Sequence, residues 1–362
     1  MSSYGPPGGQ QYPQQQYETL QYGGPPRPPR RGPSPLLIGG IVGGVVVAVV
    51  IAALVISSLL RGGSAEPPPA AGPKTVTLGG DSPGQAKALT EALTASKMEC
   101  SVRFTVNDGG LAGCFLWTDR GHTQSEVRFQ YRTDGTVIAV NAQSLKADAL
   151  RPLIATLAGV VFPADQDPVN QAFGTDRGKF DGSWGTYNTS TGTITRFVAG
   201  KSGASPLSPP RLKADTPSSA AATALKAKGF TCDESDEDCK NTFPSYNKHT
   251  GDLTIRTTGL GSDGISYLIA SVSDTSKDAL ESANYDAFAA LIETAFNVVH
   301  GPGTAAVREW ITKNTDGESH TAYVSGWRVE LVVNYGSPYE PNLPGYIHAT
   351  MYTDSLWTTP DQ

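Results

Sequence analysis

The chain contains few charged residues and few cysteines, and both are unevenly distributed along the sequence. Asp, Glu, Lys and Arg make up only 17% of the 362 residues, and Leu36 to Leu60 contains none of them. The first 99 residues have no cysteine, and residues 1–34 have almost no aliphatic side chain. A segment so poor in aliphatic residues cannot repay the entropy cost of ordering. Residues 1–34, rich in Pro, Gln and Tyr, are therefore predicted to be a disordered tail.

The uncharged stretch has the sequence LLIGGIVGGVVVAVVIAALVISSLL, which is 25 residues long. About 20 apolar residues suffice to cross the hydrocarbon core as a helix. The stretch is too long, and begins too far from residue 1, to match a secretory signal, although Gly63 to Ala65 offers a weak cleavage pattern. We therefore predict one transmembrane helix at residues 35–61.

The orientation of that helix follows from its flanking arginines. Arg27, Arg30 and Arg31 precede it, whereas Arg61 alone follows it. Positive charge favours the cytoplasmic side. The tail is therefore expected inside the plasma membrane, and the chain from residue 62 onward outside it.

Small residues in the predicted helix suggest a contact face. Gly39, Gly40, Gly43 and Gly44 place glycines four apart, the spacing of close helix–helix packing in membranes. A homodimer through this face is one hypothesis. The alternative is that glycine is simply common in membrane helices.

Two stretches of the outer part match each other. DSPGQAKALTEALTASKMEC begins at Asp81 and DTPSSAAATALKAKGFTC at Asp215, each with Ser or Thr before Pro, a helix-start pattern that predicts an N-cap. Further on, ALRPLIATLAGVVF lines up with AFAALIETAFNVVH at a constant offset of 138, with helical apolar spacing. Alternating runs between these predicted helices indicate strands with one face toward a core.

The sequence thus predicts an α+β fold built from two tandem copies of a helix-on-antiparallel-sheet unit. The predicted organisation is a linker at 62–74, unit 1 at 75–204, unit 2 at 205–357 and a short tail at 358–362. This architecture resembles the tandem repeats of secreted β-lactamase-inhibitor-type proteins of actinobacteria. The tail, the single span and the outer domain also resemble uncharacterised single-pass envelope proteins of high-GC actinobacteria, which implies an extracytoplasmic location and no site residues.

All four cysteines, Cys100, Cys114, Cys232 and Cys239, lie in the predicted outer part. An even number outside a membrane indicates structural disulfides, and four cysteines allow three connectivities. Each unit has one cysteine after its first helix and a second one soon after. The pairs 100–114 and 232–239 are therefore favoured, because each unit would then close its own loop.

Between Cys232 and Cys239 the chain carries five carboxylates in six residues, DESDED. Calcium binding is one interpretation, but the segment lacks the alternating ligands and the glycine of an EF-hand loop. A solvated acidic loop closed by a disulfide is favoured. The five histidines form no H-E-x-x-H pair, so no metal and no cofactor are predicted.

Charge bears on the choice of partner. Leaving out the five charged residues at or before Arg61 leaves 24 basic and 33 acidic residues, a net charge of −9 for the outer part. Such a domain repels nucleic acid. A neutral or basic envelope or extracytoplasmic protein is the expected partner.

Two further candidates come from composition. Aromatic residues near the C-terminus suggest a binding surface, because such side chains are enriched at recognition surfaces; they are Tyr335, Tyr339, Tyr346 and Trp357. Thr19 follows an acidic residue and is a candidate phosphorylation site for Ser/Thr kinases.

The first hypothesis for function is a single-pass, membrane-anchored binding or sensing protein of the cell envelope, without enzymatic activity. An envelope hydrolase with a dispersed active site is the second. The third is a structural subunit of a membrane complex. The sequence assigns no catalytic residue, and whether the chain is an enzyme stays open.

Overall fold

A computed structural model describes residues 76–118, 123–173, 177–208, 210–244, 250–259, 264–274, 282–335 and 345–353. Residues 71–362 belong to one compact unit. The predicted tail, its Thr19 and the predicted membrane helix with its glycines lie outside the described residues. Within the ranges described, no helix is both long and apolar enough to cross a membrane.

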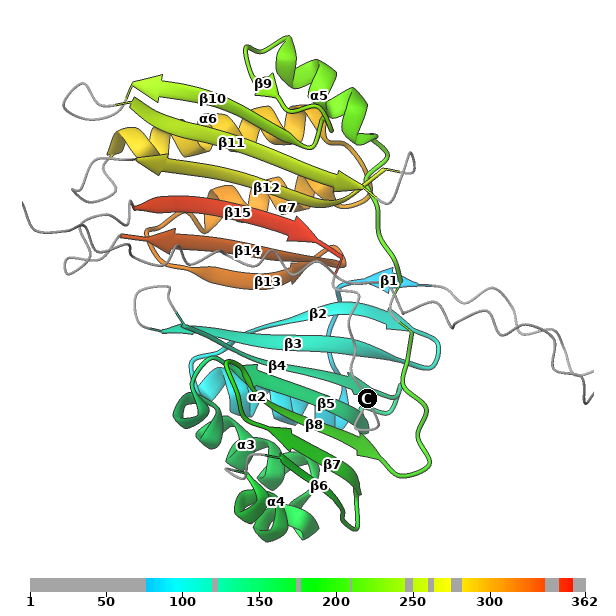
Figure 1. The fold of residues 1–362 in the computed structure, drawn as a ribbon. Helices are drawn as coiled ribbons and strands as arrows, with labels where there is room; N and C mark the ends of the chain where they lie inside the picture. The colour runs from blue at the N-terminus through cyan, green and yellow to red at the C-terminus, as the bar shows by residue number, and fades with distance from the viewer. Residues whose placement is uncertain are drawn as a thin grey trace, which may run out of the picture. The chain divides into compact units, whose positions relative to one another are not determined.

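The first half of the described chain forms an eight-stranded antiparallel sheet with helices on one face (Figure 1). Its strands are β1 (Thr77–Leu78), β2 (Glu99–Val106), β3 (Gly109–Thr118), β4 (Thr123–Tyr131), β5 (Val137–Ser144), β6 (Arg177–Asp181), β7 (Gly185–Ser190) and β8 (Thr195–Lys201). They lie side by side in the order β1-β2-β3-β4-β5-β8-β7-β6. The helices are α2 (Gly84–Ala95), α3 (Ala147–Val161) and α4 (Gln166–Ala172), with a short 3-10 turn at Pro163–Asp165.

The second half forms a seven-stranded antiparallel sheet. Its strands are β9 (Thr231–Cys232), β10 (Asp238–Pro244), β11 (Thr250–Gly259), β12 (Ile265–Asp274), β13 (His320–Val324), β14 (Trp327–Asn334) and β15 (Tyr346–Tyr352). They lie in the order β13-β14-β15-β12-β11-β10-β9. The helices are α5 (Ser218–Lys226), α6 (Ser282–Val298) and α7 (Thr304–Lys313).

The two halves repeat one topology. In each, a helix leads into four antiparallel strands, two further helices and three more strands. Apart from β1, the strand orders also correspond, since β2-β3-β4-β5-β8-β7-β6 matches β9-β10-β11-β12-β15-β14-β13. We call the halves repeat 1 (β1 to β8) and repeat 2 (α5 to β15). The α+β class with antiparallel sheets, inferred from the sequence, is confirmed.

Each sheet buries its helix-covered face. On β4, Val127 and Phe129 are fully buried in the core of repeat 1, together with Leu153 and Ile154 of α3. Because side chains alternate along a strand, Arg128 points to the other face of the same sheet. Polar and charged side chains lie on this second face, which no described helix covers.

The predicted N-caps are wrong by one residue. Pro83 and Pro217 occupy the N-cap positions of α2 and α5, and neither helix has a side-chain cap. The two hydroxyls are used elsewhere: Ser82 Oγ lies 3.2 Å from Thr90 Oγ1, and Thr216 Oγ1 accepts a hydrogen bond from the backbone N–H of His300 at 2.9 Å. Neither hydroxyl therefore caps its helix: one pairs with a later residue of α2 and the other with His300, which follows α6.

Both disulfides join neighbouring strands within one repeat. Cys100 of β2 lies opposite and is bonded to Cys114 of β3, and Cys232 of β9 is bonded to Cys239 of β10. The pairing is the one favoured from the sequence. It occurs at the same place in the topology of each repeat.

Candidate functional site

The two repeats meet where an edge strand packs on a sheet. β13 of repeat 2 contacts β2 and β3 of repeat 1. An apolar cluster of Phe104, Leu111, Phe115 and Tyr323 fills this junction, and the Phe115 and Tyr323 rings meet edge to face at 5.5 Å. Edge-to-face packing is a favoured aromatic geometry. Burial of this cluster holds the repeats together.

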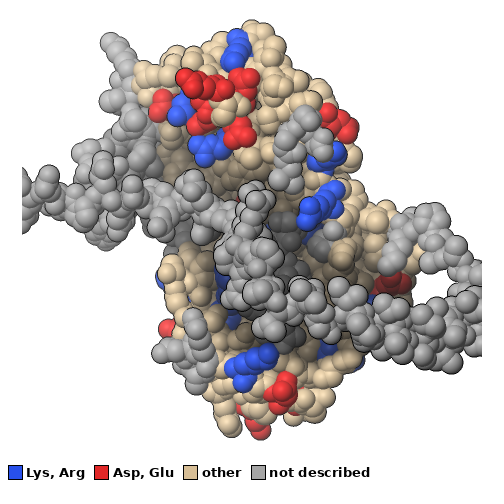
Figure 2. Space-filling view, turned by 45° about the vertical axis from the view of Figure 1, so that its right-hand side comes forward, with Lys and Arg blue, Asp and Glu red and all other residues tan. Residues whose placement is uncertain are grey.

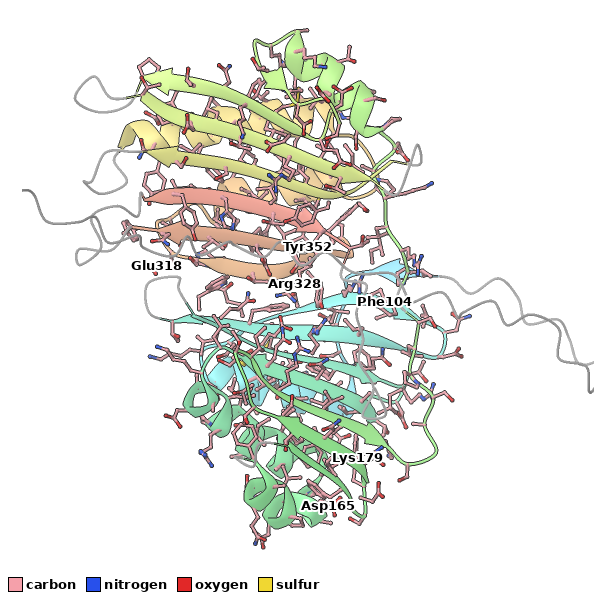
Figure 3. The ribbon with its side chains drawn as sticks, in the orientation of Figure 1. Phe104, Asp165, Lys179, Glu318, Arg328 and Tyr352 are labelled. Carbon is pink, nitrogen blue, oxygen red and sulfur yellow. A yellow bond between two sulfur atoms is a disulfide. The ribbon has the colours of Figure 1, made fainter. Side chains whose placement is uncertain are left out.

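Beside this cluster, Arg328 of β14 makes a polar bridge between the repeats (Figure 3). It is only 5% exposed. Its Nη1 lies 2.6 Å from Oε2 of Glu126 on β4, and its Nε donates to Oε1 of Glu330 at 2.9 Å. The guanidinium also lies over the Phe115 ring, 4.9 Å from its centroid. A buried arginine is tolerated when carboxylates and an aromatic face surround it in this way.

Thr321 on β13 fixes two side chains of repeat 1. Its hydroxyl oxygen accepts hydrogen bonds from Trp117 Nε1 at 2.9 Å and from Gln124 Nε2 at 2.7 Å. The Gln124 carbonyl oxygen in turn accepts from Arg328 Nη2 at 3.0 Å. The indole and the amide are thus held in place before any ligand arrives.

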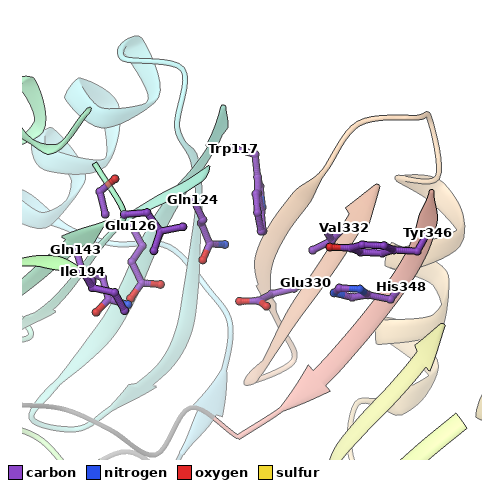
Figure 4. Close-up of a pocket in the computed structure, with 11 residues that line it drawn as sticks. Trp117, Gln124, Glu126, Gln143, Ile194, Glu330, Val332, Tyr346 and His348 are labelled. Atoms are coloured by element: carbon purple, nitrogen blue, oxygen red, sulfur yellow. The ribbon is translucent and has the colours of Figure 1, made fainter. Parts of the chain in front are cut away.

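These groups line a cleft of about 390 Å³ between the helix-free faces of the two sheets. Figure 4 shows side chains of repeat 1 facing those of repeat 2 across it. The lining residues are Trp117, Gln124, Glu126, Gln143, Ser144, Leu145, Ile194, Glu330, Val332, Tyr346 and His348. The volume lies within the range of small-molecule sites, and a mixture of aromatic and polar walls is typical of them.

On the repeat 2 wall, Tyr346 and His348 of β15 stack in parallel, with ring centroids 5.2 Å apart and planes 5° apart. Burial lowers the pKa of His348 from its ordinary value, and the nearby Glu330 carboxylate opposes this only in part. The imidazole is therefore neutral at pH 7, with one ring nitrogen able to donate and the other able to accept.

Of the aromatic residues proposed from the sequence, the structure describes Tyr335 and Tyr346. Tyr346 lines the cleft. Tyr335, by contrast, donates to the carbonyl oxygen of Gly317 at 2.6 Å and lies 3.4 Å from the Tyr285 hydroxyl of α6. Tyr339 and Trp357 lie outside the described residues.

Several residues of the cleft were missed in the sequence, above all Trp117, Glu126 and His348. Glu126 stands in the alternating run EVRFQYR, where a charged residue normally indicates a solvent-facing position. It is only 1% exposed because the second repeat lies over that face. Alternation reveals which residues share a face, and it does not reveal what covers the face.

Three carboxylates of the acidic loop have partners within the protein, although the buried Oδ1 of Asp238 accepts no hydrogen bond. The Asp233 carboxylate accepts hydrogen bonds from the Ser235 hydroxyl and from two backbone N–H groups, and the Ser235 contact is the main cause of its lowered pKa. Asp236 pairs with Lys226 at 2.6 Å, and Asp238 pairs with Arg256 at 2.9 Å. Figure 2 shows acidic and basic side chains interleaved in this way on the upper part of its face. Among the described residues, no group of three or more His, Cys, Asp or Glu is placed to hold a metal ion.

Two serine spacings bear on the hydrolase alternative. Gly80 to Gly84 has the spacing of a nucleophile elbow, G-x-S-x-G, which sequence inspection overlooked. Its Ser82 is 9% exposed and pairs with Thr90 rather than with a histidine. Ser245 and Lys248 have the S-x-x-K spacing but lie outside the described residues. Among the described residues, no histidine is hydrogen-bonded to Ser82 to act as the base that a nucleophile requires.

No protein-family model matches the chain, and no curated protein sequence matches it.

Proposed function

We propose that the chain is a membrane-anchored binding or sensing protein of the cell envelope, whose ligand occupies the cleft between the repeats. The single observation that carries this proposal is the cleft itself, with its aromatic and polar walls. Those walls are held by contacts that do not depend on a ligand, such as the bond from Trp117 to Thr321. A site ordered in advance loses less entropy on binding.

The extracytoplasmic location is part of the same proposal. Two disulfides suit an oxidising compartment. The uncharged stretch Leu36 to Leu60 would anchor the chain, and the preceding arginines would keep the tail inside. A periplasmic-type reporter fused after Gln362 is expected to be active, and activity of a cytoplasmic reporter at that site would contradict the orientation.

The binding function is tested by affinity capture from solubilised envelope, using the full chain as bait. The matched bait carries Tyr346→Ala, which removes one wall of the cleft and no hydrogen bond of the junction. We expect an envelope component to be retained by the natural chain and lost by this variant. Equal retention by both baits would place the recognition surface elsewhere, and no retention by either would remove the support for a binding protein.

A further inference from the structure

We infer that the cleft binds an electrically neutral ligand rich in hydroxyl groups, a short carbohydrate chain. This inference rests on the proposed function, because it names the ligand class of the same cleft. Three features of the lining lead to it: uncharged hydrogen-bonding side chains, balanced charge and aromatic faces.

Hydrogen-bonding groups come first. Glu126 lines the cleft but is only 1% exposed, and the guanidinium groups of Arg128 and Arg328 lie 3.2 and 2.6 Å from its carboxylate oxygens. These oxygens are shielded from solvent, so this carboxylate is occupied by charges of the protein itself. The hydrogen-bonding groups left to a ligand are uncharged side chains of the lining, such as Gln143, Tyr346 and His348, which suit hydroxyl groups.

Charge balance argues against ions. The two carboxylates of the lining, Glu126 and Glu330, are offset by the guanidinium groups of Arg128 and Arg328. An ionic ligand would add an unbalanced charge to a half-enclosed site, and that costs free energy. Neutral His348 adds no charge at pH 7. A neutral ligand with many donors fits this lining better than a phosphate, a carboxylate or an amine.

Aromatic faces complete the set. The indole of Trp117 is fixed by its bond to Thr321, and the stacked pair of Tyr346 and His348 stands on the opposite wall (Figure 4). Sugar rings combine C–H faces, which pack on aromatic rings, with hydroxyl edges. Gln143 of β5 also lines the cleft, and its side-chain amide can both donate to and accept from such hydroxyls.

A peptide is the competing occupant, and the chain itself contains one. Nine residues, DSLWTTPDQ, follow Thr353. Fully extended, nine residues span on the order of 30 Å. The peptide carries two carboxylates and therefore lacks the neutrality that the lining favours. It serves as one arm of the test.

The test is calorimetry on the full chain in a detergent without a sugar head group. The probes are neutral tetrasaccharides of glucose, mannose, galactose and arabinose, an acidic oligogalacturonate, a basic chitosan oligomer and the peptide DSLWTTPDQ. We expect at least one neutral saccharide to bind saturably and the charged saccharides to bind more weakly. Trp117→Ala and Tyr346→Ala should each weaken binding about tenfold, which corresponds to the loss of one aromatic contact.

The control is Trp310→Ala, a half-buried tryptophan on α7 outside the cleft, which should leave the affinity unchanged. Absence of binding by every neutral saccharide, or tighter binding of a charged one, overturns the inference. Binding of the peptide with the same sensitivity to Trp117→Ala also overturns it but leaves the binding function intact. Cleavage of a bound saccharide would support the ligand class and contradict the non-enzymatic function.

Discussion

Asp165, in the 3-10 turn after α3, accepts four hydrogen bonds from β7 and from the segment that joins β6 to β7. The donors are the backbone N–H and the hydroxyl of Ser183, the N–H of Trp184 and the hydroxyl of Tyr187, at 2.7 to 2.8 Å. Burial opposes ionisation of this carboxyl, but the four donors outweigh it and lower its pKa to about 2. Figure 3 labels Asp165 in the lower part of repeat 1.

Asp165→Asn is expected to lower the free energy of unfolding by about 2–3 kcal/mol, because an amide cannot accept all four bonds. The natural carboxylate stabilises the fold above the ordinary aspartate pKa of about 4 and loses this contribution as the pH falls toward 2. The difference between natural chain and variant in urea unfolding should therefore be full at pH 7 and shrink below pH 4. Asp167→Asn, an exposed neighbour, is the control. An equal loss in both variants would contradict the role of Asp165.

His320 connects the repeats by charge. Its Nδ1 lies 2.6 Å from Glu99 Oε1 of repeat 1, and its Nε2 lies 3.0 Å from Asp316 Oδ1. The bond to Glu99 is the main cause that raises the pKa of this imidazole to about 9. Its stabilising effect is thus complete below about pH 6.5 and disappears as the pH rises through 9.

His320→Gln should cost about 1 kcal/mol of stability at pH 6, a modest figure because both carboxylates are about half exposed and solvent weakens such pairs. The gap to the natural chain should close by pH 9.5 in denaturant unfolding. His300→Gln, at an exposed histidine, is the matched substitution and should cost less stability at pH 6. A gap that stays constant with pH would exclude an ionic role for His320.

At the scale of elements, strand β3 is shaped to receive β13. A Cβ on Gly113 would lie 2.7 Å from Cε2 of the Tyr323 ring and 2.9 Å from Cζ of Phe115. Such an approach is possible only at a glycine, because real Cβ contacts are not this short. The strand thus leaves room for an aromatic residue of the other repeat.

Gly113→Val should displace the Tyr323 ring and destabilise the junction by about 1–3 kcal/mol, the usual cost of overpacking. Thermal unfolding is the measurement. Gly159→Ala on α3 is the matched control, because a Cβ there meets nothing and the position is helical. This second change should raise stability by about 0.5–1 kcal/mol. A Gly113→Val chain as stable as the natural one would show that the junction tolerates a shifted ring.

Elements were predictable where the pattern is local. The apolar spacing of ALRPLIATLAGVVF gave α3, and the alternation of EVRFQYR gave β4. The N-cap predictions were wrong because the Ser82 hydroxyl pairs with Thr90 of the same helix and the Thr216 hydroxyl with His300, 84 positions away. Equivalent strands of the two repeats were recognisable, but the contact of β13 with β2 was not, because it depends on how two finished units pack.

At the scale of the molecule, Arg328 of repeat 2 links the repeats through its ion pair with Glu126 of repeat 1. It also pairs with Glu330 on its own strand. Arg328→Met should lower the free energy of unfolding by about 3–5 kcal/mol, because buried Glu126 would lose its nearer counter-charge and keep only Arg128. The double variant Glu126→Gln with Arg328→Met should recover part of this loss. Chemical denaturation of the full chain measures both.

Arg308→Met is the matched control, since its pair with Glu293 is exposed and should contribute at most about 1 kcal/mol. A loss for Arg328→Met no greater than for Arg308→Met would mean that the junction does not depend on the buried charge. Full recovery in the double variant would mean that the pair as a whole adds nothing to stability.

The cleft also depends on how the two repeats pack, so the sequence did not predict it. Trp117 and Tyr346 are 229 positions apart and come from different repeats. Composition suggested an aromatic surface and included Tyr346, but it could not separate this residue from Tyr335, which faces Gly317 and α6. Only the packing of one sheet against another distinguishes them.

The hairpin β2–β3 of repeat 1 and the equivalent hairpin β9–β10 of repeat 2 differ, and this difference bears on whether further units could add to the pair. A contact that joins the edge of one unit to the face of a like unit can be propagated without limit into a filament. Here the receiving hairpin of repeat 1 has its cysteines 14 positions apart and carries Phe104 and Phe115, whereas that of repeat 2 has them 7 apart, with only DESDED between. An incoming edge strand would meet carboxylates there in place of phenyl rings. An acidic loop at this place would oppose the docking of a further edge strand, in the way that a polar terminal repeat caps a solenoid.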